Sequence, residues 1–336
     1  MMELNTITLA DFVKLAGVIW EKTQDTLPQY ARSSGLFREE PISQNTGNTR
    51  EYSEIDTQEY AEDKLEGEQA VRAKVQQGYS KTLTSYRVAL DIGVTYEMRT
   101  QNKYPEVTQR LTNLSTTGLN RLDLDLSHRI TFGTATTYQN ISGRTIDISV
   151  GDTLALFSTV HTLRGSATTY RNRLANNPQI SKGALEGMRK LVVEQTFNHL
   201  GEKKVMSFDV LYTTDDPNAV DIATEYLKST ASPDAAHAGV VNVYNKMFRH
   251  VMLPRVATDA FGGTDTTKAK YWGIASSMTT TGHLAMFESP HMKVPAQGSN
   301  AEEFSTDDWN FGVRGGWGIC IVNGVWIKFS SGDGVA

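Results

Sequence analysis

Several features are scarce in this sequence, and each absence excludes a class of protein. A single cysteine, Cys320, among 336 residues excludes a disulfide framework and a cysteine-based metal cluster. No apolar run approaches the roughly 18 residues that a membrane-spanning helix needs, and we expect no secretory signal at the start. The chain has a net charge of −5, whereas a dedicated nucleic-acid-binding protein has an excess of basic residues. We therefore expect a soluble protein from a reducing compartment.

Motifs for catalysis and for cofactor binding are also missing. No glycine-rich loop has the spacing that cradles phosphate. His283 and His291 flank a predicted loop, and we interpret them as ordinary polar residues rather than metal ligands. Asp152, Ser158 and His161 lie close together in the sequence, but no nucleophile elbow accompanies them. The sequence predicts no enzyme activity, no cofactor and no metal site.

The strongest pattern that is present predicts one very long helix over residues 104–132. Pro105 suits a first helical turn, and Gly133 stands where a helix ends. Apolar positions trace one face, and charged positions are expected to project elsewhere. The first set is Val107, Leu111, Leu114, Gly118, Leu122, Leu126 and Ile130, and the second is Arg121, Asp123, Asp125 and Arg129. A helix of roughly 40 Å needs a sheet or another helix along its whole side.

Residues 50–86 predict a long two-armed β-ribbon with a charged tip between Glu62 and Glu68. Each arm is expected to be about 35–50 Å long. A two-stranded ribbon with so few apolar residues is marginal in water. The preceding polar stretch, residues 31–50, also contains too few apolar side chains to order itself. Both segments therefore need contacts from outside themselves.

Shorter patterns predict the remaining elements. Helices are expected over 9–20, 181–199 and 218–228, and strands over 205–212, 272–275 and 283–286. A hairpin is expected within 134–165 with turns at Gly143 and Gly151, a strand and turn over 240–254, and a loop over 287–295. The segment 311–329 predicts β-structure, with turns at Gly315–Gly316 and Asn323–Gly324.

The order of these parts and a group of local patterns resemble the major capsid proteins of tailed bacteriophages, the Hong Kong 97-type family. The patterns are Leu156–Phe157–Ser158–Thr159–Val160–His161, then Arg164–Gly165, Asn172–Arg173–Leu174 and the helix start Ser181–Lys182–Gly183–Ala184–Leu185–Glu186. A later strand and helix match with Leu211, Ala219, Ala223 and Leu227. The resemblance covers nearly the whole chain.

This resemblance implies an α+β fold of five segments. They are an N-terminal arm (1–50), an extended β-hairpin loop (51–92), a peripheral domain with a spine helix (93–160), an axial domain (161–300) and the closing strands of the peripheral domain (301–336). It also implies assembly as pentamers and hexamers into an icosahedral shell around packaged double-stranded DNA. The expected location is the virion, after assembly in the host cytoplasm.

The expected partners are other copies of the chain and the portal protein, together with possible scaffold and decoration proteins. DNA would be enclosed without sequence-specific binding, and no membrane partner is expected. Aromatic and arginine side chains are frequent anchors of interfaces. The expected intersubunit contacts are Tyr52, Tyr60, Arg72, Lys74 and Tyr79. Two alternatives stay open: an encapsulin-like compartment around enzyme cargo, and a soluble enzyme that uses residues 51–86 as a lid.

Overall fold

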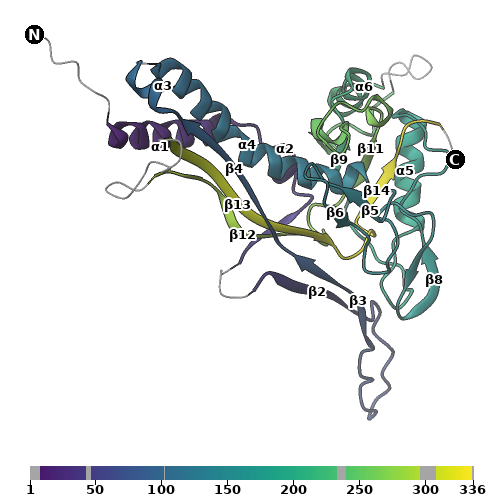
Figure 1. The fold of residues 1–336 in the computed structure, drawn as a ribbon. Coiled ribbons are helices and arrows are strands. Elements are labelled where there is room, and N and C mark those ends of the chain that lie inside the picture. Colours follow the sequence, from purple (N-terminus) through teal and green to yellow (C-terminus); the bar gives the residue numbers. More distant parts are fainter. Residues whose placement is uncertain (1–7, 43–46, 102, 233–239, 296–307, 335–336) are drawn as a thin grey trace, which may run out of the picture.

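The computed structural model describes residues 8–42, 47–101, 103–232, 240–295 and 308–334. Figure 1 shows a long helix, α4 (Tyr104–Thr131), beside an extended sheet. A compact lobe lies at one end of this body, and a two-stranded ribbon projects away from it. Within the described ranges, no helix combines the length and the apolar character needed to cross a bilayer.

The extended sheet holds four strands in the order β1-β12-β13-β4. Their bounds are β1 Arg38–Pro41, β12 Gly282–Lys293, β13 Trp309–Ile321 and β4 Tyr86–Val94. β1 pairs in parallel with β12, and the other two pairs are antiparallel. The loop predicted over 287–295 is therefore wrong as far as residue 293, because β12 continues through it.

The turn predicted at Gly315–Gly316 is also wrong, since both glycines lie inside β13. The small size of Gly315 serves close packing instead, because a Cβ there would lie 2.6 Å from the ring of Trp317. The turn predicted at Asn323–Gly324 is confirmed between β13 and the last strand. There the Asn323 side chain accepts a hydrogen bond from the backbone N–H of Val325.

Helix α4 confirms the predicted long helix, with 28 residues and a length of about 42 Å. Its apolar face packs on the extended sheet, where a Cβ on Gly118 would lie 2.6 Å from Cγ1 of Val313. The prediction that Asp123, Asp125 and Arg129 project away is wrong, because each is at most 5% exposed. The C-terminal half of α4, which carries these residues, is covered by η3 (Pro254–Val256) and by the N-terminal segment of the chain.

The lobe is built on a second four-stranded sheet in the order β10-β9-β11-β14. Its strands are β10 Arg249–Met252, β9 Val210–Thr213, β11 Trp272–Ala275 and β14 Ile327–Ser330. Helices α5 (Lys182–Glu194) and α6 (Pro217–Lys228) pack apolar side chains on this sheet. A short helix, η4 (Thr266–Lys268), precedes β11. The strand predicted over 272–275 is confirmed.

Local capping explains where the two lobe helices begin. The side chains of Ser181 and Asp216 accept hydrogen bonds from the backbone N–H groups of Ala184 and Ala219. The helix predicted over 218–228 is confirmed, whereas the one predicted over 181–199 ends at Glu194. The strand predicted over 205–212 starts only at Val210, since residues 203–209 run outside the sheet.

Each of the two sheets contains strands from more than one of the predicted segments. β12 lies in the range assigned to the axial segment, but it pairs with β13 in the extended sheet. β14 lies in the final segment, but it pairs with β11 in the lobe. The five-segment division itself stays a prediction about the assembled protein.

The N-terminal segment is fastened to the body of the same chain. Helix α1 (Leu9–Thr26) confirms the predicted first helix and buries Phe12 and Ala16 beside α4. Helix α2 (Tyr30–Ser33) and β1 follow, and Ala31, Leu36 and Phe37 belong to the main core. The prediction that residues 31–50 need contacts from outside the segment is confirmed for 31–41; residues 43–46 lie outside the described ranges. Parallel pairing with β12 supplies the missing contacts.

The ribbon consists of β2 (Thr49–Thr57) and β3 (Val75–Thr84), which pair in antiparallel register. The paired strands span about 30 Å. Residues 58–74, which we call the distal loop, connect them without forming a strand. Figure 1 shows this loop hanging beyond the rest of the chain. After β3 the chain enters β4, and helix α3 (Tyr96–Thr100) then leads to α4.

Two small hairpins occupy the region between α4 and α5. The first joins β5 (Thr137–Gln139) and β6 (Thr145–Asp147), with Gly143 at a positive φ of 72° in the connection. This hairpin confirms the predicted turn at Gly143. The second joins β7 (His161–Leu163) and β8 (Ser166–Tyr170), so the single hairpin predicted within 134–165 is two separate ones.

Candidate functional site at the base of the ribbon

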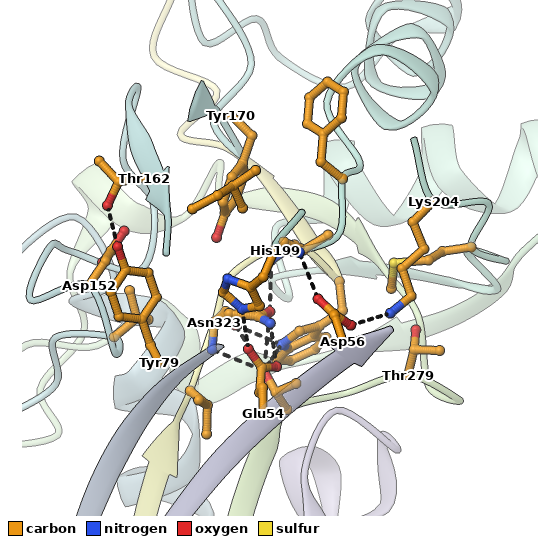
Figure 2. A pocket seen from close by; sticks show the side chains of 18 residues that line it. Glu54, Asp56, Tyr79, Asp152, Thr162, Tyr170, His199, Lys204, Thr279 and Asn323 are labelled. Atoms are coloured by element: carbon orange, nitrogen blue, oxygen red, sulfur yellow. Dashed lines mark hydrogen bonds and ion pairs between the residues drawn. The ribbon is translucent and has the colours of Figure 1, made fainter. Parts of the chain in front are cut away.

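The base of the ribbon meets three other parts of the chain around a small, partly open cavity of about 60 Å³. Figure 2 shows side chains from β2 and β3 facing residues 152–170, 197–206 and the turn after β13. These segments lie far apart in the sequence. The contacts around this cavity therefore fix the orientation of the ribbon relative to the body of the chain. We call this group of contacts the joint.

Two carboxylates of β2 form the centre of this joint. Residues two apart on a strand share a face, so Glu54 and Asp56 both point to the body. Oε2 of Glu54 lies 3.1 Å from Nε2 of His199, and Oε1 accepts a hydrogen bond from the Asn323 amide. Asp56 accepts from the backbone N–H of His199 at 2.8 Å and from Nζ of Lys204 at 3.2 Å. The ribbon is thus held by charge-assisted hydrogen bonds.

Strand β3 supplies the other half of the joint. The hydroxyl of Tyr79 lies 2.8 Å from Oγ1 of Thr162, and its ring meets His199 edge-on at 5.7 Å between centroids. Arg164 donates through Nη1 to the carbonyl of Gly78 at 2.9 Å. A Cβ on Gly78 would lie 2.4 Å from Nε2 of His199. Glycine is therefore the residue that allows this close approach.

The structure divides the predicted intersubunit residues into two groups. Tyr52 is 8% exposed, stacks on His283 at 4.0 Å and donates to Oε2 of Glu40 at 3.1 Å. Its ring is largely covered by its own chain, and its role in an interface stays a prediction. Tyr79 is half-buried in the ribbon base and already bonded within the chain.

The other three predicted contact residues lie on the distal loop. Tyr60 is 63% exposed, and Arg72 and Lys74 are exposed as well. The body of the chain leaves them free to meet another molecule. Their role in an interface stays a prediction.

Sequence reasoning missed the residues that form the joint. Arg164 appeared only in the Arg164–Gly165 pattern and Lys204 had no assigned role, so neither basic residue had a predicted partner. The alternation of Glu54 and Asp56 along β2 was the available signal for such a partner. Nothing in the sequence indicated that His199 would lie between them.

The possible hydrolase residues do not form a catalytic arrangement. His161 is fully buried, with Nδ1 2.8 Å from Oδ2 of Asp152 and Nε2 3.2 Å from the carbonyl of Leu156. Ser158 instead bonds through its hydroxyl to the backbone of Val160. Because Nε2 of the histidine faces a carbonyl rather than the serine hydroxyl, it is not placed to accept the serine proton.

The other candidate residues take structural positions. His283 and His291 are eight residues apart on β12, about 26 Å along the strand, too far to share one metal ion. Cys320 is buried in a small core cluster, and burial raises the pKa of its thiol to about 12. Among the described residues, no group of three or more acidic, histidine or cysteine side chains is arranged to hold a metal.

Replacing Glu54 with alanine is expected to loosen the ribbon from the body. The variant loses both hydrogen bonds of the carboxylate, each worth about 1.5–3 kcal/mol. A loss of about 1.4 kcal/mol already raises the population of locally open states tenfold. Hydrogen exchange followed by mass spectrometry should show exchange about tenfold faster or more across β2 and β3. Glu51→Ala, which changes an exposed glutamate on the same strand, is the control and should leave exchange unchanged.

No protein-family model matches this sequence, and no curated protein matches it. Solved structures do match along most of the chain. A structure from Gordonia phage Cozz is 11% identical, has a TM-score of 0.50 and is covered over 92% of each chain. The capsid of Myoviridae phage XM1 is 10% identical with a TM-score of 0.49, over 89% of this chain and 90% of that one. A virus-like particle from Pyrococcus furiosus is 9% identical with a TM-score of 0.46, over 95% and 99%.

The match at 11% identity with a TM-score of 0.50 establishes a likeness of fold and nothing finer. The long helix beside an extended sheet, the compact lobe and the projecting ribbon agree with that likeness (Figure 1). The fold class expected from the sequence is confirmed. This chain has the Hong Kong 97-type fold of tailed-phage major capsid proteins.

Proposed function

We propose that this chain is the major capsid protein of a tailed phage. It self-assembles as pentamers and hexamers into an icosahedral shell around packaged double-stranded DNA, and it resides in the virion. The observation that carries this proposal is the distal loop, which extends away from the body of its own chain (Figure 1).

The distal loop exposes apolar side chains that a single chain leaves in water. Tyr60, Leu65 and Val71 are 63%, 69% and 62% exposed. Full burial of one such side chain contributes about 1.5–3 kcal/mol. A neighbouring copy that covers the loop would gain this energy several times over, and interfaces between permanent partners are built in this way. Tyr60, Arg72 and Lys74 are the residues of the loop that we expect at that interface.

The charge of the chain suits a container for DNA. A net charge of −5 provides little general attraction for phosphates, and an inner wall has to release its genome. The expected partners are the chain itself and a portal protein, with possible scaffold and decoration proteins, and assembly takes place in the host cytoplasm. Binding of DNA is not expected to depend on sequence.

Deleting residues 59–70 is expected to abolish closed shells while the chain stays folded. Gln58 pairs with Lys74 at the start of the loop, its N–H lying 3.0 Å from the lysine carbonyl. The deletion therefore leaves residues 71–73 as a short hairpin connection. Size-exclusion chromatography and electron microscopy should show small soluble species in place of particles.

A replacement of residues 59–70 by twelve glycine and serine residues separates loop length from side-chain contacts. If the apolar side chains carry the interface, this variant should fail to close as the deletion does. Normal particles from the deletion variant would contradict the proposal. The contents of wild-type particles test whether the shell encloses DNA. Nuclease-protected DNA supports a capsid, enclosed protein indicates the encapsulin-like alternative, and a small oligomer without particles favours the enzyme with a lid.

A further inference from the structure

A second cavity, of about 190 Å³, lies where β3 enters the body. Its walls come from β3, the β5–β6 hairpin, α4 and the end of β13. The volume is several times the roughly 30 Å³ that one water molecule takes in the liquid. It is therefore large enough for a small polyatomic ion. None of the roles described above uses it.

The charges that line this cavity are unbalanced. Lys81, Arg129 and Arg144 are its cations, and Asp147 is the only carboxylate among the described residues that line it. Asp147 is already occupied, because Oδ2 lies 2.6 Å from Nζ of Lys81 and Oδ1 accepts from the backbone and hydroxyl of Ser149. One carboxylate thus balances one of three cations. We call this space the cationic cavity.

Arg129 is the residue that most needs a further partner. It is 3% exposed, and Nη1 donates to the carbonyl of Asp147 at 3.3 Å. Its Nε has no hydrogen-bond acceptor among the described residues. Asp125, one turn earlier on α4, accepts from Arg121, Tyr86 and Trp317 instead. A buried guanidinium without an anion is costly, so the site favours a negative ligand.

Arg144 extends the same positive character to the mouth of the cavity. It is exposed on the β5–β6 connection, and its guanidinium lies 5.9 Å from the centre of the Tyr86 ring. It forms no ion pair with any residue in the described ranges. The cavity therefore has a buried arginine at its wall and, at its entrance, an exposed arginine without an ion pair in the described ranges.

We propose that the cationic cavity is a binding site for a small oxyanion, held by Arg129 and Arg144 and supported by Lys81. Planar guanidinium groups bind carboxylate and phosphate oxygens well. Two sources share this chemistry. One is free inorganic phosphate, and the other is a carboxylate from the distal loop of a second copy. Only the second source depends on the proposed shell function.

The distal loop has the charge that the second source requires. Residues 59–68 carry five carboxylates and one lysine, and all are exposed. A carboxylate in the cavity would join β3 to α4 and to the β5–β6 hairpin. It would thus stiffen the root of one ribbon with the tip of another.

Binding of inorganic phosphate to the dispersed wild-type chain is the direct test. Calorimetric titration at constant ionic strength should show one saturable site. Arg144→Ala should weaken it about tenfold or more, because a hydrogen bond to a charged group is worth about 1.5–3 kcal/mol. Arg129→Met should abolish it. Because Arg129 is buried and its replacement also perturbs folding, the exposed Arg144 carries the test. Arg87→Ala, an exposed arginine on the adjoining strand, should bind phosphate as the wild type does.

Absence of binding, or equal binding by wild type and Arg144→Ala, would overturn the proposal. A variant that carries Glu62→Gln, Asp63→Asn and Glu66→Gln distinguishes the two sources of the oxyanion. If a neighbour's carboxylate is the natural ligand, this variant assembles poorly and phosphate inhibits wild-type assembly. If free phosphate is the ligand, the variant assembles normally. Failure of the wild type to assemble would count against the proposed function and not against the site.

Discussion

Replacing Asp125 with alanine is expected to lower the free energy of unfolding by about 3–5 kcal/mol. Asp125 is 1% exposed on α4. Its carboxylate accepts from Nε of Arg121 at 3.0 Å, from the hydroxyl of Tyr86 at 2.8 Å and from Nε1 of Trp317 at 3.1 Å. Alanine would leave a largely buried guanidinium, a hydroxyl and an indole N–H without an acceptor. A buried hydrogen-bond donor that has no acceptor costs its full desolvation free energy.

The position of Asp125 explains why the loss should be cooperative. Tyr86 begins β4 and Trp317 lies in β13, so one carboxylate joins the long helix to two strands of the extended sheet. Burial and the nearby carboxylate both raise the pKa of Tyr86 well above its usual value, so its hydroxyl remains a donor at neutral pH. Urea unfolding of the dispersed chain, followed by tryptophan fluorescence, measures the change.

Asp91→Ala is the matched control. Asp91 also pairs with an arginine, Arg314, but the side chains are 52% and 28% exposed. Exposed pairs contribute at most about 1 kcal/mol. If both variants lost the same stability, the buried hydrogen bonds of Asp125 would not be the cause.

Lys328→Met is expected to flatten the pH dependence of stability between pH 7 and pH 9. Lys328 is fully buried in β14, and burial lowers the pKa of its ammonium group to about 7. Nζ donates to the carbonyls of Gln195 at 3.0 Å and Arg171 at 3.5 Å and lies 5.7 Å from the centre of the Tyr170 ring. It forms no ion pair with any carboxylate in the described ranges.

The direction of the effect follows from proton counting. Between pH 7 and about 10.4 the unfolded chain holds this proton and the folded chain does not. Stability therefore rises with pH, by at most about 1.4 kcal/mol per unit. From pH 7 to pH 9 the wild type should gain about 2 kcal/mol that Lys328→Met does not. Below pH 7 both states are protonated, and the charge is buried at its full cost.

Chemical unfolding at several pH values measures this difference. The buried Tyr170 and Tyr212 have pKa values well above the usual range, so they stay neutral between pH 7 and pH 9 in wild type and variant alike. Lys203→Met, a change at an exposed lysine, should keep the wild-type slope. A variant curve parallel to that of the wild type would show that Lys328 does not titrate in this range.

Elements with a strong local pattern were predictable. Helix α4 has apolar residues at helical spacing with a proline at its start, and α6 has a capping aspartate followed by proline. The two-armed ribbon was visible as alternating residues around a charged tip. These signals depend only on residues that are neighbours in the sequence. The predicted elements therefore agree with the structure whatever the rest of the chain does.

The errors have one common cause, which is contact between distant parts of the chain. The loop expected over 287–295 is strand as far as residue 293, because β12 pairs with β13 there. The charged positions in the second half of α4 are solvent-facing by helical spacing alone, yet Asp123 accepts a hydrogen bond from the backbone N–H of Ala31 at 2.7 Å. The pair Gly315–Gly316 matches a turn pattern, yet it lies inside β13, where Gly315 packs closely against the ring of Trp317.

The sequence by itself determined the long helix, the ribbon and the excess of acidic side chains at its tip, since these follow from the spacing and charge of neighbouring residues. Only the tertiary structure decided which side chains remain available. It buried Tyr52 on His283, occupied Tyr79 with Thr162 and left Tyr60 exposed. It also brought Lys81, Arg129 and Arg144 around one cavity. The physical reason is that burial and charge balance depend on the three-dimensional neighbours of a residue, and strand pairing and helix packing choose those neighbours across the whole chain.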